Sequence, residues 1–224
     1  MFFIDFSFLS DGSPSFTVET RHLFFFIPHL HVSSAPDILE PAMNVILIGM
    51  KHCGKTSAGT GLARLWAVPF FDLDDLVADR YEQAYGSRPS IEEIFKQEGV
   101  SLFHHFEAHA FRRFTEDIPQ RNNRYVLALG GRTPLNPLLG DSLTRAGLVV
   151  YLNTSFPVIR ERIMRRGTSG LLKGPDPEKE LRETYEVRHP VYLSTAQLVV
   201  DGDGDLTEVI TRLADRIKEY EHVG

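Results

Sequence analysis

The sequence has little of several features that mark whole classes of protein. It contains one cysteine, Cys53, so it cannot form an internal disulfide bond, and this fits a reducing cytoplasm. No apolar segment approaches the roughly 20 residues needed to span a bilayer, so we expect no membrane partner. Lys and Arg number 24 against 30 Asp and Glu, a formal net charge of -6 without a dense basic stretch, which argues against a nucleic-acid partner.

Residues 1–42 differ in composition from the rest of the chain. They hold eight of the sixteen phenylalanines, with scattered Ser and Pro and no sustained hydrophobic period, and they lack the basic start of a secretory signal. We interpret them as an N-terminal extension, either disordered or upstream of a functional start at Met43. The alternative is an arm that packs on the domain or on a partner. Residues 43–224 are enough for one domain, which we expect to be a monomer.

From Met43 onward, short apolar runs alternate with stretches of helical periodicity. The predicted strands are 45–48, 69–71, 125–129, 148–152 and 197–200, and the predicted helices are 55–66, 74–85, 90–98, 101–114, 155–166, 177–188 and 206–221. Because the strand runs are largely apolar, without alternation, they should be buried on both faces, as in a parallel sheet with right-handed βαβ connections. The sequence therefore predicts an α/β fold, a three-layer doubly wound sandwich with a five-stranded parallel sheet. Ligands bind beyond the carboxyl ends of such strands.

A phosphate-binding loop follows the first predicted strand. Gly49, four residues, then Gly54, Lys55 and Thr56 have the spacing of a P-loop, whose backbone N–H groups converge on phosphates. The lysine can reach the β- and γ-phosphates, and the threonine hydroxyl can ligate Mg²⁺. The predicted ATP-binding residues of this loop are Gly49, Met50, Lys51, His52, Cys53, Gly54, Lys55, Thr56 and Ser57. We interpret Cys53 as filling a variable loop position, with a nucleophilic role as the alternative.

Acidic residues follow the second predicted strand. Asp72 and Asp74 are two apart at the strand end, so both side chains can face one crevice. Capping of the next helix is the simple explanation for such residues, and we assign that role to Asp75. Asp72 is then expected at Mg²⁺, through water, and Asp74 is expected to orient a substrate hydroxyl or accept its proton.

Small and basic residues follow two later elements. Gly130 and Gly131 follow the third predicted strand, where two bare backbone N–H groups allow a small ligand to approach, although an ordinary turn also explains paired glycines. Arg188 closes a predicted helix before Pro190, and its guanidinium can clamp a carboxylate through two hydrogen bonds.

The helix predicted at 155–166 ends in two arginines, followed by the glycine-containing stretch 167–170. This stretch is typical of a lid over an active site. Arg165 or Arg166 could bind nucleotide phosphates from it. The alternative is that both cations simply complement the C-terminal end of the helix dipole.

Together these motifs resemble the shikimate kinase family, in order and with similar separations, from Met43 to the C-terminus. The motifs are Gly49-x4-Gly54-Lys55-Thr56, Phe71-Asp72-x-Asp74, Phe103-x-x-Phe106-Glu107, Leu129-Gly130-Gly131, Leu171-Leu172-x-Gly174-Pro175-Asp176 and Arg188-x-Pro190-x-Tyr192. The resemblance implies a nucleoside-monophosphate-kinase-like fold. It also implies transfer of the γ-phosphoryl group of ATP, with Mg²⁺, to a hydroxyl of shikimate, giving shikimate 3-phosphate in aromatic amino acid biosynthesis.

The resemblance also assigns roles to individual residues. It makes Lys55 and Thr56 the phosphate and metal residues, Asp74 the residue at the acceptor hydroxyl, and Arg188 a ligand of the acceptor carboxylate. With the reading of the individual residues, we predict that Lys55, Asp74 and Arg166 are catalytic and that Thr56 and Asp72 lie at the metal. The predicted acceptor-binding residues are Asp74, His104, Gly130, Gly131, Arg132 and Arg188. ATP and a small anionic acceptor are the expected partners.

Three positions depart from the family's pattern, and all three concern the acceptor. His104 stands where the family has an arginine, Arg132 replaces the third glycine of a triplet, and Ser169–Gly170 replace an arginine and a proline in the lid. A neutral imidazole does not replace a permanently charged guanidinium. Three hypotheses stay open: an active shikimate kinase in which Arg132 supplies the missing guanidinium, a kinase of this fold with another hydroxylated acceptor, and a nucleotide-binding module with little catalysis.

Overall fold

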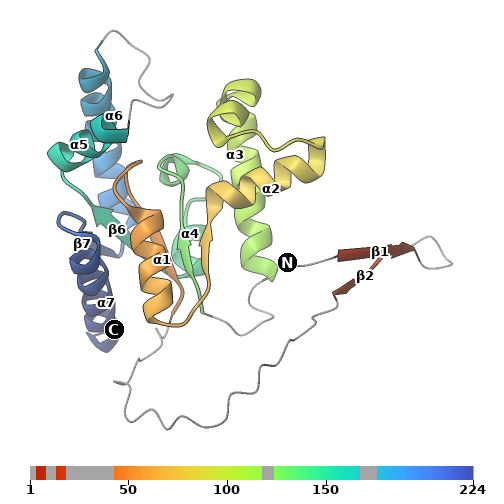
Figure 1. Ribbon diagram of the computed structural model, residues 1–224, viewed down its shortest axis with the longest axis horizontal. Helices are drawn as coiled ribbons and strands as arrows, with labels where there is room; N and C mark the ends of the chain where they lie inside the picture. The colour runs from red at the N-terminus through yellow and green to blue at the C-terminus, as the bar shows by residue number, and fades with distance from the viewer. Residues whose placement is uncertain (1–3, 9–13, 19–42, 118–123, 167–175, 224) are drawn as a thin grey trace. The chain divides into compact units, whose positions relative to one another are not determined.

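The structure is a computed structural model that describes residues 4–8, 14–18, 43–117, 124–166 and 176–223 (Figure 1). The chain divides into two compact units, Met1–Asp37 and Ile38–Gly224. In the first unit, β1 (Ile4–Phe8) pairs antiparallel with β2 (Pro14–Val18). The interpretation of residues 1–42 as an extension stays a prediction.

The second unit is built on a five-stranded parallel sheet. Its strands are β3 (Val45–Ile48), β4 (Phe70–Asp72), β5 (Val126–Ala128), β6 (Leu148–Asn153) and β7 (Leu198–Asp201), in the spatial order β4-β5-β3-β6-β7. Every strand lies within two residues of its predicted bounds. The predicted α/β fold with five parallel strands is therefore confirmed.

Helices connect the strands and cover the sheet (Figure 1). They are α1 (Lys55–Leu65), α2 (Leu73–Tyr85), α3 (Ile91–Asp117), α4 (Ser142–Ala146), α5 (Phe156–Arg166), α6 (Pro177–Thr195) and α7 (Leu206–Val223), with a short 3₁₀ turn, η2 (Thr133–Leu135). α1 packs against α7 and contacts β3, β4 and β5, whereas α6 contacts β6 and η2. No described helix is long and apolar enough to cross a membrane.

The helices expected at 90–98 and 101–114 are confirmed as two helical stretches of α3, separated by non-helical backbone at Gly99, where φ is 75°. Two other helical features differ from the prediction. α6 continues to Thr195 past Pro190, where an end was expected. The short elements α4 and η2 were not predicted at all.

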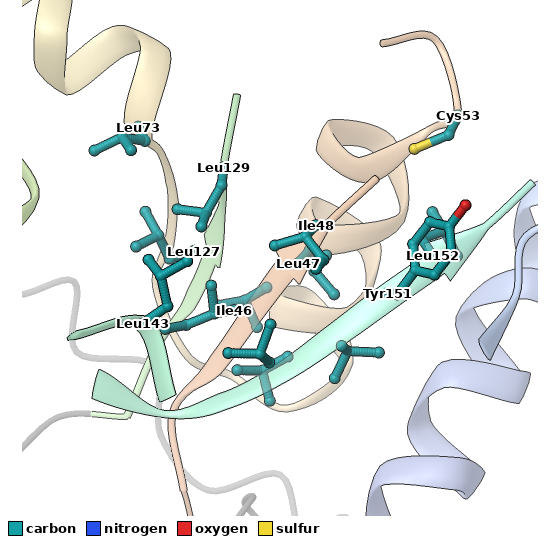
Figure 2. Close-up of a cluster of buried hydrophobic side chains, with 14 of the residues drawn as sticks. Ile46, Leu47, Ile48, Cys53, Leu73, Leu127, Leu129, Leu143, Tyr151 and Leu152 are labelled. Atoms are coloured by element: carbon teal, nitrogen blue, oxygen red, sulfur yellow. The ribbon is translucent and has the colours of Figure 1, made fainter. Parts of the chain in front are cut away.

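The core lies around the central strand, and Figure 2 shows it. All four residues of β3 are fully buried, together with side chains of β5 and β6 such as Leu127 and Leu152. Burying each such aliphatic side chain contributes about 1.5 to 3 kcal/mol. This buried core fixes the strands, and so positions the loops that follow them.

Removal of residues 1–42 tests whether the first unit contributes to this core. A chain that begins at Met43 is expected to keep the melting temperature and activity of the full chain, because β3 pairs with β5 and β6 and with nothing before it in the sheet. Differential scanning calorimetry of both chains measures this. A drop of more than about 4 °C, the scale of 1 kcal/mol for a chain of this size, would instead make the N-terminal residues part of the folded core.

Candidate active site

A cavity of about 980 Å³ opens beyond the carboxyl ends of the strands. It is lined by the loop after β3 with the start of α1, the start of α2, α3, the residues after β5, the end of β6, α5, α6, and the turn after β7 with the start of α7. The cavity is thus at the place where α/β sheets bind their ligands. It brings together most of the residues that the sequence singled out.

The loop between β3 and α1 is shaped for phosphate. Gly49 has φ of 148°, and a Cβ there would lie 2.9 Å from the carbonyl oxygen of Leu152, so only glycine fits without strain. Gly54 is the N-cap of α1 in the left-handed region, and no side chain caps the helix. The first N–H groups of α1 therefore stay available to an anion.

Lys55 lies along the inside of this loop. Its ammonium donates hydrogen bonds to the carbonyl oxygens of Gly49 and Met50, both at 2.9 Å, and lies 3.7 Å from the Cys53 sulfur. These partners carry no formal charge, so the positive charge of Lys55 is left for a phosphate. Cys53 is buried, as expected of a residue that fills the loop.

Thr56, in the first turn of α1, contacts Asp72, the last residue of β4. The Thr56 hydroxyl donates to Asp72 Oδ2 at 3.0 Å, and Asp72 Oδ1 accepts the backbone N–H of Asp74 at 3.1 Å. Asp72 is therefore the N-cap of α2, and the prediction that gave this role to Asp75 is wrong. The reason is that β4 runs directly into the helix, which begins at Leu73.

The chemistry of this pair suits Mg²⁺. A hydroxyl and a carboxylate are hard oxygen ligands, and Mg²⁺ in nucleotide sites takes one or two protein ligands beside water and phosphate. Burial raises the pKa of Asp72, a cost that a cation would remove. In the part of the chain that the structure describes, no three acidic, histidine or cysteine side chains gather as a metal cluster. As a hydroxyl and a carboxylate, Thr56 and Asp72 fit Mg²⁺ bound to a nucleotide.

Asp74 is the most perturbed carboxyl group of the cavity. Burial, and then the neighbouring Asp72 carboxylate, raise its pKa to about 6, while the Lys55 ammonium opposes the shift. A Cβ at Gly130 would lie 2.6 Å from Asp74 Oδ1, which explains the glycine at that position. A carboxylate with a pKa near 6 is suited to accept a proton at neutral pH.

Two guanidinium groups lie on the other side of the Gly130–Gly131 turn. Arg188 donates to the Gly131 carbonyl at 3.4 Å, and Arg132 stacks 4.3 Å above the ring of Phe95. Partial burial, and then the positive charge of Arg188, lower the pKa of Arg132, and both side chains line the cavity. An anion between them would relieve this repulsion.

The chain matches the family model for shikimate kinase over residues 51–218. The chain belongs to the shikimate kinase family. It is 35% identical to the shikimate kinase of Dechloromonas aromatica, over 73% of this chain and 84% of that one, and 32% identical to that of Ruegeria pomeroyi, over 77% and 82%. Among solved structures it is similar to shikimate kinase from Acinetobacter baumannii in complex with shikimate, with a TM-score of 0.66 and 28% identity over 82% of this chain and 94% of that one.

As a member of this family, the chain is a phosphotransferase of the P-loop kinase type. It does not test the role of any single residue, so the assignments made from the motifs stay predictions. The structure adds where each of these side chains lies. Lys55, Thr56, Asp72, Asp74, Arg132 and Arg188 all line the one cavity.

A histidine, His104, stands where the family has an arginine. Phe103 and Glu107 line the cavity, but in the described part of the chain His104 does not, and its carbonyl oxygen accepts a hydrogen bond from Asn136 Nδ2 at 3.0 Å. Burial raises the pKa of Glu107, and the hydrogen bonds from Thr133 and Asn136, and then the charge of His104, oppose this shift. Contact of His104 with a substrate thus remains a prediction.

The lid arginines are only partly described. Arg165 pairs with Glu161 on the exposed side of α5. The Arg166 side chain and residues 167–175, which include Ser169–Gly170, lie outside the described residues. The predicted roles of Arg166 and of the lid therefore stay predictions.

The sequence analysis assigned no role to two residues of the site, Arg162 and Glu107. Arg162 donates to the Cys53 carbonyl at 2.7 Å and so braces the phosphate loop from α5. Glu107 is 1% exposed and accepts hydrogen bonds from Thr133 Oγ1 at 2.6 Å and Asn136 Nδ2 at 2.8 Å. Glu107 belongs to a motif that the sequence displayed, but its partners come from a turn that was not predicted.

Proposed function

We propose that this chain transfers the γ-phosphoryl group of ATP to a hydroxyl of shikimate, giving shikimate 3-phosphate and ADP. One observation carries the proposal: the half-buried Asp74 carboxylate shares a single cavity with the phosphate loop and with the guanidiniums of Arg132 and Arg188. The loop suits ATP, the carboxylate suits a hydroxyl, and the guanidiniums suit the carboxylate of the acceptor. Relatives over most of the chain are shikimate kinases, which supports the same acceptor.

The residues divide the chemistry between them. Asp74 accepts the proton of the acceptor hydroxyl as its oxygen forms a bond to the γ-phosphorus. The bond from that phosphorus to the β,γ-bridging oxygen breaks, and its electron pair leaves with ADP. Lys55 and the N–H groups of α1 hold the phosphates in line with the hydroxyl. Thr56 and Asp72 would hold Mg²⁺, which would neutralise charge on the phosphate oxygens.

A coupled assay of ADP release with shikimate, other hydroxy acids and neutral sugars tests the proposal. We expect shikimate to give the highest kcat/KM in the panel. A different anionic acceptor in first place would keep the kinase and change its substrate. ADP release that no acceptor stimulates would indicate a nucleotide-binding module.

Arg132 tests the acceptor half of the site. Arg132→Ala is expected to lower kcat/KM for shikimate by roughly 10 to 150-fold, the scale of one charged hydrogen bond, and to leave the KM for ATP nearly unchanged. Initial rates over both substrates measure this. Arg182→Ala is the matched control, because Arg182 stacks 4.2 Å above Phe156 but does not line the cavity.

A second variant asks whether Arg132 stands in for the family's arginine. His104→Arg combined with Arg132→Gly should recover much of the activity toward shikimate that Arg132→Ala loses. If Arg132→Ala costs less than about twofold with the best acceptor, far below one charged hydrogen bond, the compensation idea is wrong. The altered pocket would then point to a different substrate.

A further inference from the structure

We propose that Lys51 is a further catalytic residue, whose ammonium group leaves the Glu92 carboxylate when ATP enters and binds the phosphoryl group in transfer. The inference rests on the proposed phosphoryl transfer. It does not depend on which acceptor is used, and the experiment below exploits this.

Lys51 stands where the two halves of the cavity meet. It belongs to the phosphate loop, yet a Cβ at Gly131 would lie 3.3 Å from its backbone nitrogen, so the loop touches the acceptor turn at this residue. Its ammonium pairs with Glu92, on the first half of α3, and both side chains line the cavity. Lys51 therefore spans from the phosphate side to the wall of the acceptor side.

The Gly130–Gly131 turn brings Lys51 and Asp74 to neighbouring positions. A Cβ at Gly130 would lie 2.6 Å from Asp74 Oδ1, and a Cβ at the next residue, Gly131, would lie 3.3 Å from the backbone nitrogen of Lys51. The transferring phosphoryl group must pass between the loop and the hydroxyl held by Asp74. A cation anchored on the loop beside this turn lies along that path.

Lys51 can leave the Glu92 carboxylate with little loss of free energy. Lys51 and Glu92 side chains are each 42% exposed, and an ion pair this open to water stabilises little. Phosphoryl oxygens carry more charge than one carboxylate and draw the ammonium away. Lys55, in contrast, is 9% exposed and held by two carbonyls, so the two lysines begin from different states.

Charge builds on three oxygens of the phosphoryl group as the new oxygen–phosphorus bond forms and the bond to ADP breaks. Several donors are needed around them. Arg132 and Arg188 lie at the acceptor end, and Arg165 is paired with Glu161 on the outside of α5. Lys51 supplies a donor from the loop itself, beside the Gly130–Gly131 turn.

The experiment is calorimetric titration of the protein with Mg²⁺, ADP and fluoroaluminate, a planar mimic of the phosphoryl group in transfer, without any acceptor. For Lys51→Met we expect the affinity for ADP with fluoroaluminate to fall by roughly 10 to 150-fold, and the affinity for ADP alone to stay within about threefold of wild type. Lys51→Arg should keep most of the affinity, because it keeps the charge. Lys96→Met removes another lysine of the same cavity wall and should change neither affinity.

Glu92→Gln separates a catalytic lysine from a structural ion pair. Freed from Glu92, Lys51 should bind the mimic as tightly as wild type or more tightly, opposite to Lys51→Met. If the ion pair only held α3 against the loop, both variants would lose affinity alike, and this would overturn the proposal. A Lys51→Met protein within about threefold of wild type toward the mimic, or a wild type that gains nothing from fluoroaluminate, would also overturn it.

The same titration keeps this proposal apart from the acceptor assignment. If the wild type is inactive with shikimate, but Lys51→Met binds the mimic more weakly than the wild type does, the role of Lys51 stands and shikimate is rejected as the acceptor. If the wild type is active with shikimate, and Lys51→Met is unchanged in kcat and in the titration, shikimate stands as the acceptor and the role of Lys51 is rejected. Should Lys51→Met fail to fold, Lys51→Gln, with a polar side chain on the exposed loop, serves in its place.

Discussion

The Lys55→Met variant should lose phosphoryl transfer by about 1,000-fold or more, the scale on which a cation at the transferring phosphoryl group acts. Lys55 is the cation inside the phosphate loop, and its partners in the structure are carbonyl groups that a phosphate can replace. Methionine keeps the length of the side chain but removes the charge. Single-turnover measurement of ADP formation at saturating ATP checks the loss.

The control for this variant is a lysine that does not line the cavity. Lys179→Met removes an ammonium that is 72% exposed on α6 and should retain full turnover. Circular dichroism and the melting temperature must show that Lys55→Met is folded. Near-normal turnover of a folded Lys55→Met protein would end the interpretation of the chain as a kinase.

The second large effect is expected at Asp74. Asp74→Asn removes the proton acceptor, so kcat should fall by about 100 to 10,000-fold, while the KM for ATP changes little. Initial rates at varied ATP measure both. If the variant loses ATP binding and keeps kcat, the roles of Asp72 and Asp74 must be exchanged.

The pH dependence of the wild type follows from the same group. Asp74 acts as a base only when it is ionised, and its pKa is about 6. We therefore expect kcat to fall as the pH drops below about 6, with the limb set by this carboxyl group. A pH–rate profile that stays flat down to pH 4.5 would show that another group accepts the proton.

Asp74 should also leave a signature in stability, of a definite sign. Its pKa is higher in the folded chain, about 6, than its ordinary value of 3.8, so between these values the folded state binds more protons than the unfolded state. Lowering the pH from 6 toward 4 therefore gains folding free energy from this group. At pH 7 the ionised carboxylate costs up to about 3 kcal/mol, and Asp74→Asn should be more stable than wild type in urea unfolding.

Local sequence predicted the sheet and the phosphate loop because neither depends on distant partners. A strand such as β3 is apolar at every position since both of its faces are covered, whatever strands flank it. The loop is recognisable because glycine and lysine are required by backbone geometry and charge within a few residues. The same is true of the bend at Gly99, which separated two predicted helices.

The missed features depend on contacts between distant parts of the chain. α6 was expected to end before Pro190, but the buried ring of Tyr192 and its hydrogen bond to the Gly131 carbonyl, at 2.6 Å, hold the next turn in place. Glu107 meets Thr133 from 26 residues away, and Arg162 meets the Cys53 carbonyl from 109 residues away. No local pattern reports such partners.

The bend in α3 lets one helical run serve two parts of the cavity. Gly99 has a φ of 75°, and nothing lies within 4 Å of where its Cβ would be, so the bend is a property of the backbone. It divides a segment that carries Phe95 and Glu92, which line the cavity, from one that carries the buried Glu107. Phe95 packs edge-on against Phe103 across the bend, with ring centroids 5.4 Å apart. A single glycine thus turns one helix into two arms that share a hydrophobic hinge, and a change in either arm is felt by the other.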